Sequence, residues 1–131
     1  MPYGSVLTDT VQSSTAGTPP QFNDGNGTQV GTLCRAWVNF NGTTSPGTIR
    51  GSFNVTSVTK VGTGQYTVNF TNALPDANYA VTGLSDADGN GQATIHLANA
   101  VPPTSSSCRI AVYFVGVALQ DHNYNTVAFF R

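Results

Sequence analysis

The sequence reads CRAWVNFNGTTSPGTIRGSFNV between residues 34 and 55, where two strand-like runs flank a turn-forming segment rich in Gly, Thr and Pro. In the first run the apolar side chains occupy every second position, which is the period of a β-strand. Its predicted inner face comprises Cys34, Ala36, Val38 and Phe40. In the second run, Ile49, Phe53 and Val55 are predicted to share the inner face.

The same alternation continues along the chain. In VTKVGTGQYTVNF, residues 58–70, a Gly-Thr-Gly turn joins two runs as a hairpin, and Tyr66, Val68 and Phe70 are predicted to face inward. The most apolar run, CRIAVYFVGVAL at residues 108–119, is typical of a central strand buried on both sides. No segment predicts a helix of three turns. We therefore expect an all-β protein, an antiparallel, jelly-roll-like β-sandwich of about seven or eight strands.

The first thirty residues differ from the rest of the chain. They are rich in Ser, Thr, Gly and Pro, and Pro19-Pro20 and the DGNG turn at residues 24–27 interrupt any long element. This composition predicts an extended arm. The expected organisation is an N-terminal arm or attachment segment over residues 1–30 and a β-sandwich domain over residues 31–131.

The surface of this protein is expected to be almost uncharged. Hydrophobic residues make up 39% of the chain, but charged residues only 8%, where roughly a quarter is usual. With a net charge of −1 there is no attraction to nucleic acid, and no apolar run is long enough to insert into a membrane. Neutral outer faces suit contact with another subunit or with the extracellular medium. This favours an assembled extracellular or virion protein over a cytosolic enzyme.

The segments LCRAWVNFNGT, residues 33–43, and IRGSFNVTSVTKVGTGQYTVNFTNALPDANYAV, residues 49–81, resemble a domain of bacteriophage tail fibres and receptor-binding tips. The resemblance implies a homotrimeric knob in the virion, on a tail fibre or spike. It also implies that the N-terminal arm binds other virion proteins and that distal loops bind a bacterial surface glycan or protein during adsorption. A capsid decoration or head-fibre protein on the head surface is the alternative.

Loops carry recognition more often than strands do. The sequence DHNYN at residues 121–125 places a histidine and a tyrosine among amides, groups that stack on sugar rings and hydrogen-bond their hydroxyls. We therefore predict receptor contacts from His122, Asn123, Tyr124 and Asn125, with an ordinary turn as the alternative for each residue.

One loop resembles the start of a calcium-binding loop. Asp86, Asp88 and Asn90 stand at alternate positions before a glycine, which is how a tight turn directs several oxygens at Ca²⁺. The closing acid is absent, because the twelfth position is Leu97. A structural turn is therefore favoured and a Ca²⁺ site is the alternative; no other cofactor is expected.

The remaining reactive side chains suggest no enzyme. No motif indicates a nucleophile or a pair of catalytic acids, so catalysis is not expected. Cys34 and Cys108 both lie in alternating runs, which favours two buried thiols over a disulfide. Trp37 falls opposite the Cys34 face. For Trp37 we favour burial at a subunit interface or beneath a loop, and a ligand platform is the alternative.

Overall fold

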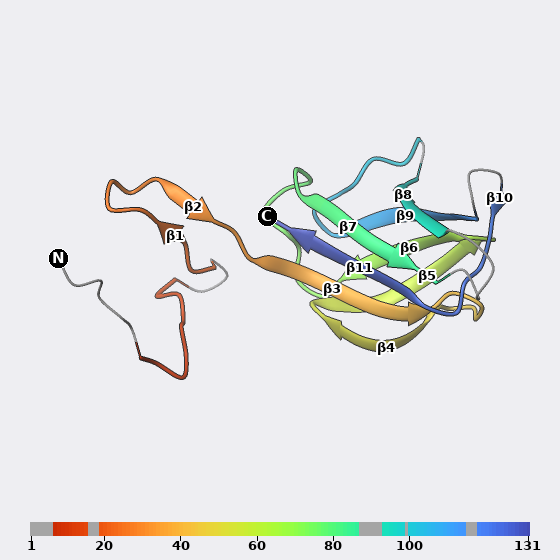
Figure 1. Cartoon of the computed structure of the whole chain (residues 1–131), viewed down its shortest axis with the longest axis horizontal. Helices are drawn as coiled ribbons and strands as arrows, with labels where there is room; N and C mark the ends of the chain where they lie inside the picture. Colours follow the sequence, from red (N-terminus) through yellow and green to blue (C-terminus); the bar gives the residue numbers. More distant parts are fainter. Residues whose placement is uncertain (1–6, 16–18, 87–92, 99, 115–117) are drawn as a thin grey trace. The chain divides into compact units, whose positions relative to one another are not determined.

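The computed structural model describes residues 7–15, 19–86, 93–98, 100–114 and 118–131. In this part of the chain all regular structure is β, which confirms the predicted fold class, and no helix is present that could cross a membrane. The strands are β1 (Phe22–Asn23), β2 (Gln29–Gly31), β3 (Cys34–Asn41), β4 (Thr48–Phe53), β5 (Val55–Gly62), β6 (Gln65–Phe70), β7 (Ala80–Ser85), β8 (Ala93–Leu97), β9 (Ser107–Phe114), β10 (Ala118–Leu119) and β11 (Asn125–Phe130) (Figure 1).

The chain divides into two compact units, residues 1–32 and residues 33–131. The first unit contains one antiparallel hairpin, β1–β2. Asp24 shapes its turn, because its Oδ1 accepts hydrogen bonds from the backbone N–H groups of Asn26 and Thr28 at 2.9 and 2.8 Å. Several apolar side chains of this unit are exposed, namely Leu7, Val11, Phe22 and Val30.

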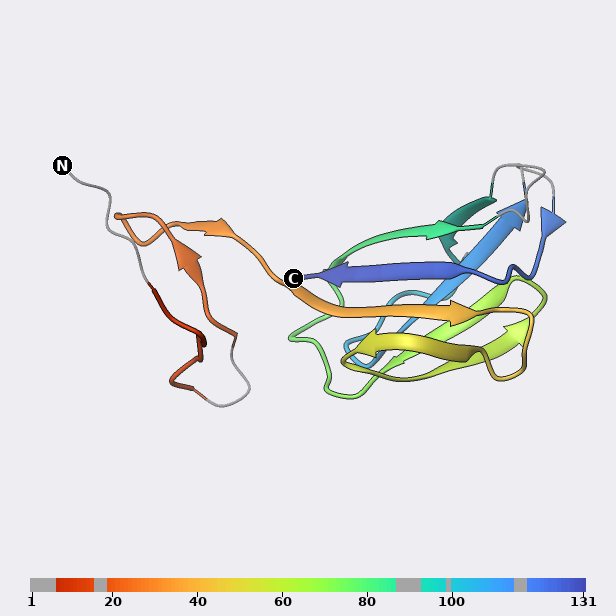
Figure 2. The same ribbon diagram turned by 60° about the horizontal axis from the view of Figure 1, so that its bottom comes forward.

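The second unit is a sandwich of two antiparallel sheets. One sheet has the strand order β4-β3-β11-β7. The other has the order β10-β9-β6-β5, with β8 also paired to β9. β6 and β10 pair with different residues of β9, so both can lie along the same edge of it. β8 pairs with residues of β9 that also pair with β6 or with β10, so β8 must lie along the opposite edge. Figures 1 and 2 show the strands of one sheet running obliquely across those of the other.

Four pairings of the sandwich join strands that are neighbours in sequence, namely β3–β4, β5–β6, β8–β9 and β9–β10, so many connections are hairpins. The predicted jelly-roll-like sandwich therefore matches the packing of two antiparallel sheets, whereas these hairpin connections differ from those of a jelly roll. Residues 33–131 contain nine described strands where seven or eight were expected, and β10 has only two residues. The run beginning at residue 108 does form a central strand, because β9 is paired on both of its edges.

The core lies between the two sheets and follows the predicted alternation. Residues facing inward from β3, β6, β9 and β11 are at most 8% exposed, and they include Ala36, Val38, Phe40, Tyr66, Val68, Phe70, Cys108, Ile110, Val112, Val127 and Phe129. Phe129 packs edge-on against Phe70 and Tyr79, with ring centroids 4.9 and 5.8 Å apart. Edge-to-face aromatic contacts of this kind add to the free energy gained from burying the rings.

The two cysteines are free thiols, as the favoured interpretation predicted. Cys108 is only 1% exposed, and burial raises the pKa of its thiol. Cys34 is less buried than Cys108.

The prediction for Phe53 was wrong. Ile49 pairs with Phe40, but one position along β3 Asn39 pairs with Gly51, so Arg50 is an extra residue in β4. This β-bulge reverses the alternation, and Phe53 faces outward beside Trp37 with 55% of its surface exposed. Asn54, at a left-handed φ of 55°, then separates β4 from β5, and Val55 returns to the core at 8% exposure.

Candidate functional site

The predicted recognition loop, residues 121–125, follows β10 and ends at the first residue of β11, and it is anchored at Asp121. Asp121 Oδ2 lies 2.6 Å from Lys60 Nζ on β5. Asp121 Oδ1 accepts hydrogen bonds from the Gly64 N–H at 2.8 Å and the Tyr66 hydroxyl at 2.6 Å. Burial alone would raise the pKa of Asp121, but the hydrogen bonds from Gly64, Lys60 and Tyr66 outweigh it and hold this pKa below its usual value.

Gly64 and Tyr66 are suited to this anchor. A Cβ at Gly64 would come within 2.6 Å of the Gln120 backbone nitrogen, and its φ of 64° lies in the left-handed region, so a larger residue would not fit. Burial of the Tyr66 ring, with the hydrogen bond and the charge of Asp121, raises the pKa of the phenol. Tyr66 therefore stays a neutral donor to the carboxylate at neutral pH.

The middle of the loop is fixed through the backbone of His122. Its carbonyl oxygen accepts from the Gly42 N–H at 2.9 Å and from Asn125 Nδ2 at 2.8 Å. Asn125 Oδ1 in turn accepts from the Ser85 hydroxyl at 2.8 Å. His122 and Asn125 are both 0% exposed, and neither ring nitrogen of His122 has a hydrogen-bond partner within the described residues. The His122 carbonyl group and the Asn125 side chain therefore hold the loop in place from inside.

The outer side of the loop is formed by Asn123 and Tyr124, and Arg50 joins them from β4. Arg50 Nη1 donates to the Asn123 carbonyl oxygen and Nη2 donates to Asn123 Oδ1, both at 2.7 Å. The guanidinium carbon lies 4.1 Å from the centre of the Tyr124 ring, a cation–π contact. We call Arg50, Asn123 and Tyr124 the Arg50 cluster.

The β-bulge explains how Arg50 enters this cluster. An extra residue in a bulged strand bends the strand and redirects a side chain, and Arg50 is the extra residue of β4. A two-pronged guanidinium contact with one amide residue orients both groups. The Tyr124 carbonyl oxygen also accepts from the Asp86 N–H at 2.8 Å, so the loop is tied to the end of β7. Tyr124 is nevertheless 50% exposed.

The structure divides the four predicted receptor residues into two pairs. The prediction for His122 and Asn125 was wrong, because fully buried side chains cannot touch a receptor in this arrangement. Asn123 and Tyr124 stay a prediction, now supplemented by Arg50. The sequence analysis did not identify Arg50 as a site residue, because it is 73 residues away from Asn123 and no local pattern connects them.

The predicted calcium loop is only partly described. Asp86 is exposed, whereas Asp88 and Asn90 lie outside the described residues. Among the described residues no group of three His, Cys, Asp or Glu side chains could hold a metal ion. The Ca²⁺ alternative therefore stays a prediction that rests on the sequence pattern alone.

The chain was compared with known proteins. No protein-family model matches it, and no curated protein matches it. A solved structure to which it is similar is the crystal structure of the phiAB6 tailspike in complex with three-repeated oligosaccharides of Acinetobacter baumannii surface polysaccharide. The TM-score is 0.49 at 17% sequence identity, and the alignment covers 95% of this chain and 30% of that one. The chain thus spans about 30% of the tailspike's length, and its function has to be argued from its own residues.

Proposed function

We propose that this protein is a receptor-binding component of a bacteriophage virion, at the tip of a tail fibre or spike, and that it holds a host surface glycan on the Arg50 cluster. The observation that carries the proposal is the half-exposed ring of Tyr124, held in place by Arg50 from one side and by its own backbone from the other. An aromatic ring offers a flat apolar surface for the face of a sugar. The neighbouring amide and guanidinium offer hydrogen bonds to its hydroxyls.

Preorganisation supports binding at this cluster. A loop that is ordered before the ligand arrives loses little conformational entropy when the ligand binds. Here Asp121, His122 and Asn125 fix the loop from inside, so the exposed residues hold one arrangement. Each site would bind weakly. Three copies in one knob, the trimer implied by the resemblance, would multiply that affinity through avidity.

We propose binding without catalysis. Asp121 already accepts three hydrogen bonds, and Asp76 is paired with Arg131 at 2.6 Å, so both carboxylates have structural partners. The test for catalysis is to incubate the protein with host polysaccharide and to measure newly formed reducing ends. We expect none, and an increase over a heat-denatured sample would contradict this part of the proposal.

The binding test uses an array of bacterial surface polysaccharides probed with the full chain. We expect Tyr124→Ala to weaken binding to any positive glycan at least about tenfold, in the range of hot-spot residues. Tyr113→Ala is the matched control, because Tyr113 also contacts a neighbouring side chain, His96, but lies on β9 in the other sheet. Equal binding by both variants, or no binding to any bacterial glycan by the unaltered chain, would refute the proposal.

The alternative function is attachment to the capsid head as a decoration. The exposed apolar side chains of the arm, Leu7, Val11, Phe22 and Val30, favour a partner surface for residues 1–32 in either function. Gold-labelled antibody on intact particles distinguishes them. Label at the tail supports the proposed function, and label confined to the head supports decoration.

A further inference from the structure

The outer face of the β4-β3-β11-β7 sheet carries two rows of side chains that cross all four strands. The strand registers define one row as Phe53, Trp37, Ala128 and Thr82. The adjacent row is Gly51, Asn39, Thr126 and Leu84. We call these eight residues the two-row face. None of the eight is ionisable, and the face includes three of the large apolar side chains that the chain leaves exposed.

The exposure of those three side chains is high for a protein with so few charges. Trp37 is 41% exposed, Phe53 55% and Leu84 78%. Since a large aromatic side chain can bury 150–250 Å², Trp37, Phe53 and Leu84 together expose roughly 300 Å² in one copy. A standard interface buries roughly 1,600 Å², and a little over half of this area is non-polar. The exposed apolar area of these three side chains, counted in two copies, is about two-thirds of that non-polar area.

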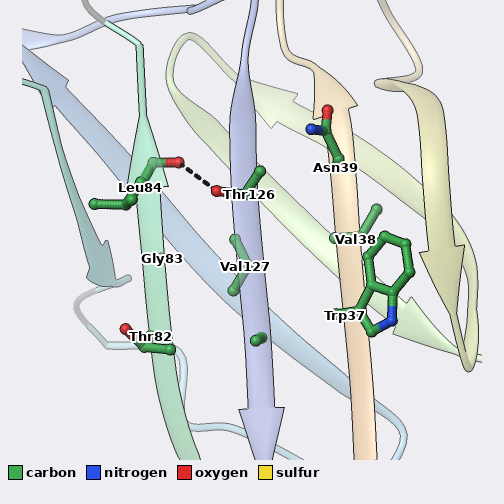
Figure 3. A pocket seen from close by; sticks show the side chains of 9 residues that line it. Trp37, Val38, Asn39, Thr82, Gly83, Leu84, Thr126 and Val127 are labelled. Carbon is green, nitrogen blue, oxygen red and sulfur yellow. Dashed lines mark hydrogen bonds between the residues drawn. The ribbon is translucent and has the colours of Figure 1, made fainter. Parts of the chain in front are cut away.

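The two-row face contains both a ridge and a hollow. The hollow has a volume of about 330 Å³ and lies over small residues of β11 and β7, between Trp37 and Leu84 (Figure 3). Its floor includes Gly83, Thr126 and Ala128. Trp37 forms one wall of the hollow, and Phe53 pairs with it on the neighbouring strand. We call Trp37 and Phe53 the ridge. A bulky apolar side chain such as phenylalanine or leucine fits a hollow of this size, and the same face presents both.

The polar groups of the hollow are poorly placed for a sugar. Thr126 Oγ1 donates its proton to the Leu84 carbonyl oxygen at 3.3 Å (Figure 3). Asn39 Oδ1 is shielded from solvent and has no hydrogen-bond partner among the described residues. A sugar ring would thus find one aromatic wall and few reachable donors. The lining therefore favours apolar side chains as occupants over hydroxyls.

We infer that the two-row face is the surface on which a second copy of this chain docks, with the ridge of one copy seated in the hollow of the next. The proposed function also assumes that several copies of this chain assemble. Here the two-row face is assigned as the surface through which they do so. It assigns Trp37 to a subunit interface and leaves the Arg50 cluster free for a ligand.

The experiment measures the mass of the full chain in solution by light scattering over a dilution series, without any glycan. The unaltered chain is expected at a multiple of its 13.7 kDa. Leu84→Lys and Phe53→Lys place a charge in the interface and are expected to weaken association about a hundredfold each. Val61→Lys is the matched control, because Val61 is 43% exposed but lies on β5 in the other sheet. Its mass should equal that of the unaltered chain.

Trp37 supplies a second readout, because it is the single tryptophan of the chain. Its emission is expected to shift to longer wavelength when the unaltered chain dissociates on dilution, and to be shifted already in Leu84→Lys. A monomer at every concentration overturns the inference. The inference is also overturned if Leu84→Lys and Phe53→Lys assemble as well as Val61→Lys does, because association then uses another surface. A monomer whose Trp37 emission responds to polysaccharide overturns it too, and shows a ligand on this face.

These outcomes are separate from those of the glycan array. If Leu84→Lys is a monomer that still binds a positive glycan through Tyr124, the interface is supported and each site binds alone. If the chain assembles and binds no glycan, the proposed receptor function fails and the interface stands.

Discussion

The outer face of the β4-β3-β11-β7 sheet carries Trp37, Phe53 and Leu84. In the other sheet, the outward positions of β6 and β9 carry polar side chains such as Thr67, Asn69 and Arg109, and Val61 is exposed on β5. On the polar face, Asn69 Nδ2 lies 3.0 Å from both Ser57 Oγ and Thr59 Oγ1. These polar side chains satisfy one another and the remaining groups face water. On the two-row face the large exposed side chains Trp37, Phe53 and Leu84 are apolar, and the described part of the sandwich leaves 41%, 55% and 78% of their surface uncovered.

The difference between the faces separates a surface that water can satisfy from a surface that the inferred second copy would cover. A surface of amides and hydroxyls is hydrated without charge, so it offers no driving force for association. An apolar surface of the same size is stabilised by being covered. The two faces share one core. The following predictions separate the contributions of the core and of each face to the free energy of unfolding and to association.

The largest expected effect comes from the core that both faces share. Phe129→Ala should lower the free energy of unfolding by about 3–5 kcal/mol, because it removes a 0% exposed ring and leaves a cavity between the sheets. Thr126→Ala, on the exposed side of the same strand, should change it by no more than about 0.5 kcal/mol. Urea unfolding measures both. Similar losses in the two variants would contradict the assignment of inner and outer sides to β11.

An intermediate effect is expected at Asp121, which ties the loop before β11 to the β5–β6 hairpin. Asp121→Asn should lower the free energy of unfolding by about 1–3 kcal/mol at pH 7, because Lys60 loses its ion pair and two further hydrogen bonds are weakened. The folded-state pKa of Asp121 lies below 3.8, so its contribution is present above pH 3.8 and is lost as the pH falls through the folded-state pKa.

Unfolding of the unaltered chain and of Asp121→Asn at pH 7 and near pH 2 tests this prediction. The difference in stability between them should shrink as the pH falls below 3.8 towards the folded-state pKa, because protonation removes the charge that only the unaltered chain carries. Asp76→Asn is the control, since Asp76 pairs with Arg131 at the surface and should change stability little. A difference that stays constant with pH would show that the charge of Asp121 is not what anchors the loop.

The smallest expected effect compares the two faces directly. Asn69→Ala should cost about 1 kcal/mol of stability, because it removes the hydrogen bonds to Ser57 and Thr59, and it should leave association unchanged. Trp37→Ala should do the reverse, weakening association while changing the unfolding of the dissociated chain little. The mass in dilution series and the unfolding midpoint of each variant are the measurements. An assembly that depends on Asn69 would place the interface on the polar face.

Much of the fold could be predicted from local pattern. The inward positions Tyr66, Val68 and Phe70 follow from a period of two between a Gly-containing turn and an Asn-rich loop, and all three are buried. The candidate site was harder to predict. The loop at residues 121–125 was found from its composition, but composition cannot tell which side chains of a loop point inward. His122 and Asn125 turned out to be the buried ones.

The sequence by itself determined the all-β class, the positions of most strands and the low surface charge, because these depend on alternation, turn residues and composition within a few positions. Only the tertiary structure decided that a bulge at Arg50 turns Phe53 outward and brings the guanidinium to Asn123 and Tyr124. The same holds for the hollow beside Trp37. These features depend on the register between strands and on the packing of loops from distant parts of the chain, which no local pattern specifies.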